Sequence, residues 1–357
     1  MVEVEVNGMV DADADADVDE LVDLAEMRLT EWTSCGGCAA KWGASLLSSL
    51  VSEFPTSNDP SLLVGLAPFD DAAVYRISDD LAMVSTTDFF PPLVDHPSDF
   101  GAIAAANACS DVFAMGGRVT IAVNITAFPE HFPRNAIMAI FDAAAAVVVE
   151  AGGSIAGGHT IRNPEPIFGL AVQGLVHPDR IFRKEGAIVG DVLMISKPLG
   201  TAIALAGGTS EDKAVAIAGM RRLNREASEV LQSHASAVHA VTDVTGYGLF
   251  GHAWDMAERA GAVFDFDHSA LPLYPGVAGA LARGIRTGGD PRNREHVQSH
   301  VRIVGGLGDE IAAIGYDPQT SGGLLAAVHP SIATALAGSG FTQVGSVVAG
   351  PAQIVLH

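Results

Sequence analysis

The chain has 357 residues, 48% of them hydrophobic, and is too long for one small core, so we expect two domains. Its 42 acidic residues outnumber its 20 basic residues, and the formal net charge of −22 argues against a surface that binds nucleic acid. We therefore expect no nucleic-acid partner.

Lysine is scarce and occurs only at Lys41, Lys184, Lys197 and Lys213. An acidic, lysine-poor surface around an ordinary apolar core is typical of proteins that work in high salt, where self-repulsion is screened. Unfolding in dilute buffer with recovery in molar KCl would support this hypothesis, and indifference to salt would remove it.

The three cysteines, Cys35, Cys38 and Cys109, are too few for a disulfide framework and favour a reducing cytoplasm. The N-terminus lacks the positive and apolar regions of a secretory signal. The most apolar segment, 136–149, is interrupted by Asp142, so we expect a buried helix there and no membrane partner.

Residues 1–28 contain an alternating Asp-Ala run of one charge sign. Such a segment buries too little apolar surface to fold, so we interpret it as a disordered, solvated acidic tail. An interaction arm is the alternative.

A small-residue loop, Thr-Ser-Cys-Gly-Gly-Cys-Ala-Ala-Lys at 33–41, precedes a predicted amphipathic helix at 42–54. Cys35 and Cys38 do not suffice for structural zinc, which needs four ligands, and the thioredoxin-like context of a redox pair is absent. A thiol near Lys41 at a helix start favours a nucleophilic thiolate. An inert loop thiol is the alternative.

Periodicity predicts a first group of strands and helices with polar residues at their ends. The predicted strands are 62–66, 72–77, 81–87, 119–127 and 167–177, and a long helix covers 134–152. Asp70 and Asp71 lie at a turn, and Asp88 follows a strand. The Ala-Gly-Gly-His-Thr sequence within 154–160 predicts a turn that could meet an anion, with His159 as an ordinary turn histidine otherwise.

The pattern then restarts. We expect a strand at 192–196, Ala-rich helices to about 237, a strand at 238–244, an irregular surface loop at 283–302, a turn at 317–323, a strand at 324–328, a helix at 330–338, and strands at 343–348 and 353–356. Asp243 falls at a strand end before a glycine-rich helix start. Neither a Walker loop nor a Rossmann fingerprint is present.

The stretch Asn-Ala-Cys-Ser-Asp-Val-Phe-Ala-Met-Gly-Gly at 107–117 closes a helix that we expect to begin near Ser98, as its N-cap, and to stop at Gly116 and Gly117, as its C-cap. Asn107 and Asp111 are four residues apart and share one helix face. A buried carboxylate needs a partner, so this face belongs either to a capping network or to a site.

Five aspartates, Asp70, Asp71, Asp88, Asp111 and Asp243, stand at turns or on helix faces in glycine-rich sequence. If they converge, their repulsion requires a counter-charge, and Mg²⁺ is the hard cation that suits carboxylates and nucleotide phosphates. Such an arrangement suits phosphoryl transfer. The alternative is that they cap helices and strands separately.

A family resemblance rests on motifs at 38–41, 70–75, 85–90, 107–117, 156–159, 164–172, 242–252 and 317–325. With these motifs the sequence resembles the selenophosphate synthetase (selenide, water dikinase) family from Leu29 to the C-terminus. Aminoimidazole ribonucleotide synthetase and thiamine-phosphate kinase, of the same superfamily, share the aspartates but lack the Cys and Lys before the first helix.

The resemblance implies a two-domain α/β (α+β) fold like that of aminoimidazole ribonucleotide synthetase, with mixed sheets flanked by helices. It implies an ATP- and Mg²⁺-binding domain at 29–180 with a mobile Cys/Lys loop, a C-terminal α/β domain at 181–357, and N-terminal sheets that pair across a homodimer. The implied reaction converts ATP, selenide and water into selenophosphate, AMP and phosphate. Several Mg²⁺ ions, K⁺ as a further cation, and a selenium-delivery protein as a further partner belong to the same expectation.

Residue roles carry over by position. Cys38 matches the catalytic cysteine, and Lys41 matches an essential lysine that also serves the nucleotide. The nucleotide-site matches are Phe69, Asp70, Asp88, Asn107 and Asp111. The magnesium-ligand matches are Asp71, Asp111 and Asp243. The matches to a loop that reaches ATP from the partner subunit are Gly158, His159 and Thr160.

One departure concerns the cysteine motif. Many family members carry Cys-Gly-Cys-Lys, whereas Ala39 and Ala40 follow Cys38 here and Cys35 lies upstream. Whether Cys35 substitutes for the second family cysteine is open. The competing hypotheses are a kinase of this superfamily with another small substrate, which Cys38 and Lys41 argue against, and a non-catalytic nucleotide-binding protein, which the aspartate set argues against.

The cysteine loop predicts a separation of nucleotide binding from selenium chemistry. Cys38→Ser should still bind Mg-ATP but make no selenophosphate, because a thiolate suits a soft selenium anion and the aspartates do not depend on it. Lys41→Ala should behave like Cys38→Ser, and Cys35→Ser should keep substantial activity. Anaerobic product formation by the two cysteine variants is the measurement; an active Cys38→Ser beside an inactive Cys35→Ser would show that the nucleophile is misassigned.

Overall fold

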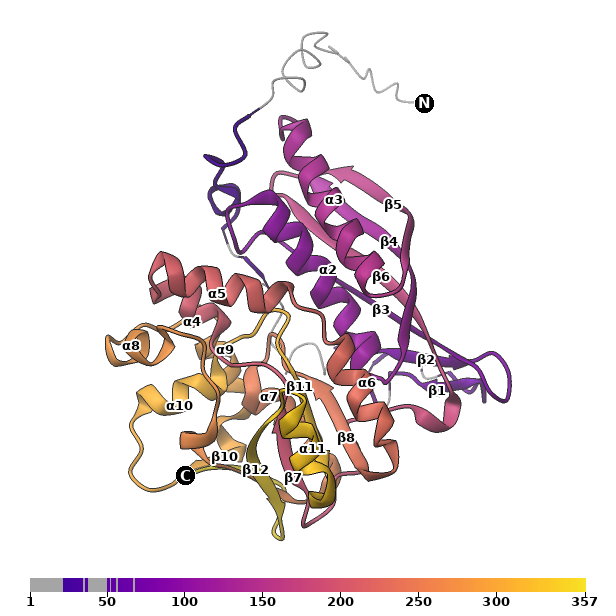
Figure 1. Cartoon of the computed structure of the whole chain (residues 1–357), viewed down its shortest axis with the longest axis vertical. Helices are drawn as coiled ribbons and strands as arrows, with labels where there is room; N and C mark the ends of the chain where they lie inside the picture. Colours follow the sequence, from indigo (N-terminus) through magenta and orange to yellow (C-terminus); the bar gives the residue numbers. More distant parts are fainter. Residues whose placement is uncertain (1–21, 35, 38–49, 52, 56, 67) are drawn as a thin grey trace, which may run out of the picture.

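The computed structural model describes residues 22–34, 36–37, 50–51, 53–55, 57–66 and 68–357, and it forms two domains around two β-sheets (Figure 1). The predicted acidic tail and the predicted helix at 42–54 lie mostly outside these residues. Leu24 and Met27, just before the 3₁₀ helix η1 (Leu29–Trp32), already pack against the first core.

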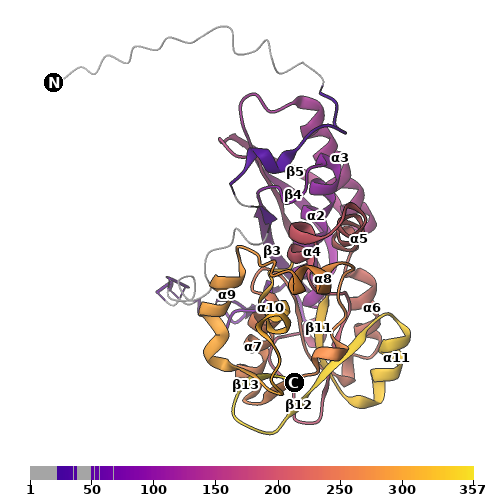
Figure 2. The same cartoon turned by 90° about the vertical axis from the view of Figure 1, so that its left-hand side faces the viewer.

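The first domain is built on a six-stranded mixed sheet of order β1-β2-β3-β6-β4-β5. Its strands are β1 (Leu62–Val64), β2 (Ala73–Arg76), β3 (Ala82–Phe90), β4 (Arg118–Phe128), β5 (Ser154–Arg162) and β6 (Ile167–Val176). Helices α2 (Pro97–Ala114) and α3 (Arg134–Glu150) lie side by side over one face of this sheet (Figures 1 and 2). β4 and β5 run parallel, whereas the other pairs are antiparallel.

Helix α2 is buried on nearly every side because small residues let its neighbours approach closely. A β-carbon at Gly101 would lie 2.2 Å from the carbonyl oxygen of Ile140 on α3. The helix ends at Ala114 with Met115 as its C-cap, and Gly116 follows with a φ of 74°, a left-handed conformation that favours glycine. This burial explains why the polar side chains of α2 matter: each must find a partner inside the protein.

The second domain is built on a seven-stranded mixed sheet of order β10-β13-β9-β12-β7-β11-β8. Its strands are β7 (Val192–Ile195), β8 (Val238–Asp243), β9 (Val263–Phe266), β10 (Val301–Ile303), β11 (Leu324–Val328), β12 (Thr342–Val348) and β13 (Gln353–Leu356). Its helices are α4 (Thr201–Gly207), α5 (Ser210–Arg221), α6 (Arg225–Ser233), α7 (Gly248–Ala260), α8 (Val277–Ala282), α9 (Asp290–Val297), α10 (Asp309–Tyr316) and α11 (Ala333–Gly338).

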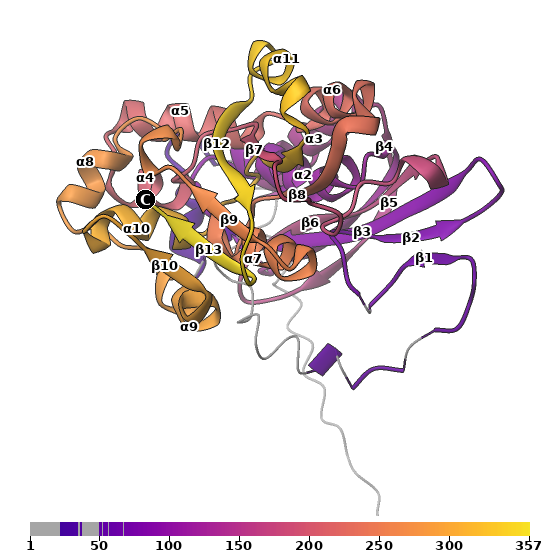
Figure 3. The ribbon, with the colours of Figure 1, turned by 90° about the horizontal axis from the view of Figure 1, so that it is seen from below.

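Both faces of this second sheet are buried. Along β11, Leu325 and Ala327 join the core under α7, while Leu324 and Ala326 join the core under α6 and α11. Strands buried on both faces read as continuous apolar runs, as 324–328 does. Figure 3 shows α6 and α11 on one side of the strands and α7 and α9 on the other.

The expected fold class is confirmed, but three local predictions are wrong. The predicted turn at 154–160 is strand β5, whose largely exposed residues gave no alternating pattern. The predicted irregular loop at 283–302 contains α9, where Asn293 donates to the carbonyls of Gly246 and Tyr316. The helix expected from Ser98 begins at Pro97, with His96 in the N-cap position.

The two domains meet along α2. Asn224 donates to Ser110, Ser228 donates to the carbonyl of Phe113, and Arg221 pairs with Asp99 at 2.8 Å. None of the helices in the described part of the chain is both long and apolar enough to cross a membrane.

Candidate active site

The polar face of α2 meets strand β3 of the first sheet. Asn107 donates a short hydrogen bond to Asp88, and Thr86 donates to Asp111 at 2.5 Å. Residues 86 and 88 point to the same side of β3, and residues 107 and 111 lie on one face of α2. The Asn107–Asp88 and Thr86–Asp111 hydrogen bonds therefore lie about one helical turn apart along α2. Asn107 and Asp111 therefore share one face of α2, as their spacing predicts.

Asn107 also reaches the second domain. Its side-chain oxygen accepts a hydrogen bond of 2.8 Å from the backbone amide of Ser321. Ser321 has a φ of 49°, the one positive φ of a non-glycine residue in the described part of the chain. Backbone in this region is held by its surroundings, so the turn at 317–323 is shaped to present this amide to α2.

Asp70 precedes β2 and is almost fully buried beside positive charge. Its carboxylate accepts from the backbone amides of Asp71 and Lys184 and lies 3.7 Å from Arg259. Burial, together with the neighbouring Asp71 carboxylate, raises the pKa of Asp70 to about 6. Phe69 lies beside this group, with the guanidinium of Arg259 5.0 Å from the centre of its ring.

Asp71 forms the centre of a second charged group. Its Oδ1 lies 2.8 Å from Nζ of Lys184 and accepts from Thr242 at 3.0 Å. Thr242 directly precedes Asp243, the last residue of β8, and the side chains of adjacent strand residues point to opposite faces of the sheet. Burial alone would lower the pKa of Lys184, but the carboxylates of Asp71 and Asp255 outweigh burial and hold it above its usual value.

The residues fit a hard cation in one respect. Oδ2 of Asp71 is buried and has no hydrogen-bond partner among the described residues, which leaves a carboxylate oxygen available to an ion. Within those residues, however, no three His, Cys, Asp or Glu side chains form a group that could hold a metal by themselves. An ion at Asp71 would therefore need oxygen atoms from elsewhere, such as the phosphates of a nucleotide.

Gly158, His159 and Thr160 lie on β5, the exposed edge of the first sheet. Thr126 donates to the carbonyl of His159 and to the hydroxyl of Thr160. Three strand steps separate β5 from β3, which places the two strands about 14 Å apart. These residues therefore do not join the aspartates within one chain.

The described cysteine is Cys109, and it is fully buried in α2. Burial and the nearby Asp111 raise the pKa of its thiol to about 12, so it is inert at neutral pH. Cys35, Cys38 and Lys41 lie outside the described residues.

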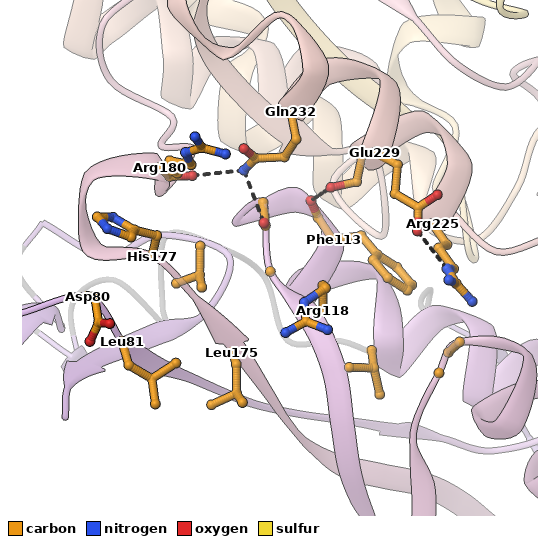
Figure 4. Close-up of a pocket in the computed structure, with 17 residues that line it drawn as sticks. Asp80, Leu81, Phe113, Arg118, Leu175, His177, Arg180, Arg225, Glu229 and Gln232 are labelled. Carbon is orange, nitrogen blue, oxygen red and sulfur yellow. Dashed lines mark hydrogen bonds and ion pairs between the residues drawn. The ribbon is translucent and has the colours of Figure 1, made fainter. Parts of the chain in front are cut away.

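A cavity of about 470 Å³ lies where β4 begins and β6 ends, next to the C-terminal ends of α2 and α3 (Figure 4). Arg118, Arg180 and Arg225 line it, and Arg225 is already bonded to Glu229 and to the carbonyl of Glu150. None of the predicted site residues lines this cavity. It is therefore separate from the aspartate site.

The sequence did not single out Lys184, Arg259, Asp255, Thr86 or Ser321 as site residues. For Lys184 a signal existed, because it is one of four lysines in an acidic chain. Its partner Asp71 is far away in sequence, so only the fold reveals the contact.

Known proteins resemble this chain in sequence over most of its length. The model of the N-terminal domain of AIR synthase related proteins matches residues 69–176, and that of their C-terminal domain matches residues 189–356. A selenide, water dikinase of Myxococcus xanthus is 45% identical over 84% of this chain and 87% of its own length. A selenide, water dikinase of Caldanaerobacter subterraneus is 42% identical over 85% of this chain and 89% of its own length.

The chain belongs to the selenide, water dikinase family. The predicted resemblance is thus confirmed. The crystal structure of thiamine-monophosphate kinase from Stenotrophomonas maltophilia has the same fold as this family member, with a TM-score of 0.61 at 19% identity, covering 89% of this chain and 96% of the kinase chain.

Asp317, at the start of the turn that carries Ser321, is fully buried among donors. Thr287 donates to its Oδ1 at 3.1 Å, and Gln319 donates to its Oδ2 at 3.0 Å. Burial dominates and raises the pKa of Asp317 from 3.8 to about 7.

This shift predicts a pH-dependent stability. Between pH 3.8 and about 7 the folded protein holds a proton on Asp317 that the unfolded chain has lost, so stability falls as pH rises through this window. Asp317→Asn should remove that loss, which is at most about 1.4 kcal/mol per pH unit. Denaturant unfolding at several pH values measures it.

The control for this prediction is Asp179→Asn, because the Asp179 side chain is 89% exposed. Its pH profile should parallel that of the wild type. If the Asp317→Asn profile is also parallel, Asp317 does not titrate as its burial implies.

Proposed function

We propose that this chain is a selenide, water dikinase that converts ATP, selenide and water into selenophosphate, AMP and phosphate. The observation that carries the proposal is the pair of buried carboxylates of Asp70 and Asp71, set against Lys184 and Arg259, with Thr242 bonded to Asp71. Buried charges of this density indicate a functional site. The membership of the chain in this family gives the site its reaction.

We assign nucleotide binding to the region formed by α2, β3 and the segment that precedes β2. We assign Phe69, Asp70, Asp88, Asn107 and Asp111 to the nucleotide, and Asp71, Asp111 and Asp243 to Mg²⁺. The ion would neutralise phosphate charge in a site with few basic groups. Asn107 contributes rigidity, because its amide is fixed by Asp88 on one side and by Ser321 on the other.

Selenium handling is assigned to Cys38 and Lys41. A thiolate is a soft nucleophile that suits selenide, and an adjacent ammonium favours both anions. A selenium-delivery protein, K⁺ as a further ion, and a cytoplasm of high salt complete the proposal.

We also propose that the protein is a homodimer that pairs its first sheets. The sheet face opposite α2 and α3 carries Phe89, Ile121 and Ile161, which are 50%, 38% and 54% exposed. Strand register places Phe89, Ile125 and His159 in one row across the sheet. An apolar face of this kind suits a second copy, whose edge strand β5 would bring Gly158, His159 and Thr160 to the neighbouring site.

The alternative is a kinase of the same superfamily that acts on another small substrate. It would use the same aspartates but would not require selenide for ATP turnover. The phosphorus-containing products of the reaction distinguish the proposed dikinase from this alternative kinase.

The test of the reaction is anaerobic ³¹P NMR of the protein with Mg-ATP and selenide. We expect selenophosphate, AMP and phosphate from the wild type. Asp71→Asn should lose nearly all turnover, roughly 100-fold or more, because charge stabilisation of the phosphoryl groups is lost. Thr334→Ala, at an exposed position of α11 in the second domain, is the control and should react normally. ADP as the sole nucleotide product would favour the alternative.

The test of the dimer is sedimentation combined with activity. Phe89→Glu should yield folded monomers, because it buries a charge in the proposed interface, and activity should fall with the dimer fraction. Met138→Glu, on the exposed side of α3, is the control and should remain dimeric. Monomeric wild-type protein with full activity would refute the dimer without affecting the assigned reaction.

A further inference from the structure

Lys184 is a cation buried against carboxylates. Its side chain is 5% exposed, and Nζ lies 2.8 Å from Oδ1 of Asp71 and 3.7 Å from Oδ2 of Asp255 on α7. The Lys184 backbone amide also donates to Asp70 at 3.1 Å. Main chain and side chain thus hold this residue against the acidic pair that precedes β2.

The Asp71 carboxylate divides its two oxygens between different tasks. Oδ1 is occupied by Lys184 and by the hydroxyl of Thr242, whereas Oδ2 is buried and has no partner among the described residues. A buried carboxylate oxygen without a donor is costly, and the ammonium on the other oxygen offsets part of that cost. The charges of Asp71 and Lys184 therefore balance each other, while Oδ2 of Asp71 still lacks a hydrogen-bond donor among the described residues.

From this arrangement we infer that Lys184 is the resident counter-ion of Asp71 and that it opposes binding of a divalent cation there until nucleotide phosphates supply negative charge. The inference rests on the proposed function, in which Asp71 is a metal ligand, and it adds the order of binding. A cation that approaches Oδ2 shares one carboxylate with an ammonium 2.8 Å from Oδ1, and the repulsion between them weakens its binding. The negative charge of a nucleotide polyphosphate next to both the Lys184 ammonium and the metal ion would offset this repulsion.

Arg259 provides an internal comparison. Lys184 and Arg259 both contact the ring of Phe69, with Nζ at 5.4 Å and the guanidinium carbon at 5.0 Å from its centre. Arg259, however, pairs with Asp70 at 3.7 Å and donates to the carbonyl of Phe69. Both residues contribute a positive charge to the same group, but the described contacts attach only Lys184 to Asp71.

The experiment measures Mn²⁺ binding by EPR in the absence of nucleotide, using the full-length protein. Lys184→Met should bind Mn²⁺ about tenfold tighter than the wild type, because the repelling charge is gone. Lys184→Arg should stay within about twofold of the wild type, since its charge remains. With a non-hydrolysable ATP analogue present, the gain of Lys184→Met over the wild type should shrink.

Two controls identify the ligand and the position. Arg259→Met removes a charge from the Asp70 side and should tighten Mn²⁺ binding far less than Lys184→Met does. The double variant Lys184→Met with Asp71→Asn should lose the gain.

A second measurement covers the case in which Lys184→Met does not fold. The four lysines allow Nζ resonances of the wild type to be followed by ¹⁵N-lysine NMR, with Lys184 assigned from Lys184→Arg. Its ammonium resonance should be present in EDTA, should change little with Mg²⁺ alone, and should shift when Mg²⁺ and the analogue are added together.

The outcomes separate this inference from the proposed function. If Asp71→Asn binds Mn²⁺ with the analogue as tightly as the wild type, the assignment of Asp71 to the metal fails. If Asp71→Asn weakens binding but Lys184→Met binds no tighter than the wild type, or if the Lys184 resonance responds equally to Mg²⁺ alone, the inference about Lys184 is overturned while the metal assignment stands.

Discussion

The amide side chain of Asn107 connects the parts of the molecule that the candidate site requires. It donates to Asp88 on β3 and accepts from Ser321 in the second domain, and it does so from a helix that is buried along most of its length. An amide that satisfies two partners at once fixes both of them relative to the helix, because shifting either would leave a buried polar group unbonded. Asn107 thus ties strand β3 and the turn that carries Ser321 to the same helix.

Two buried lysines differ in how their charge is balanced inside this acidic protein. The chain is strongly acidic, yet two of its four lysines, Lys184 and Lys197, are buried. Lys184 faces carboxylates, which keep its pKa high, whereas Lys197 donates to the carbonyls of Arg222 and Ser321, and burial with the nearby Arg222 lowers its pKa to about 7. The environments of these two buried lysines thus give their ammonium groups opposite pKa shifts.

The sequence predicted the parts of the fold that have a strong local pattern. Buried strands such as 324–328 and the Ala-rich helix around Asn107 were recognisable because apolar periodicity reports burial directly. Strand β5 was not, since an exposed edge strand has no buried face to show in its sequence. Helix α9 was missed because its stability comes from buried Asn293 and from the Arg294–Asp290 pair rather than from an apolar stripe.

In the candidate site, too, the residues with a local sequence signal were predictable and those that depend on long-range contacts were not. The aspartates were identified from motifs, and Asn107 and Asp111 from helical spacing, because these signals are local. The cations that face them were not, because Lys184 lies 114 residues from Asp70 along the chain and a contact of that range has no local signature. The placement of Gly158, His159 and Thr160 on an edge strand distant from β3 likewise depends on strand order, which no single segment encodes.

The burial of Cys109 has a practical consequence for studying this protein. With its pKa raised to about 12 and no solvent contact, Cys109 is silent toward alkylating reagents while the protein is folded. Any thiol label that the native protein takes up at neutral pH can therefore be assigned to Cys35 or Cys38 without replacing Cys109. The same thiol becomes reactive once α2 is exposed, so one labelling experiment with mass spectrometry reads loop chemistry and global unfolding on separate peptides.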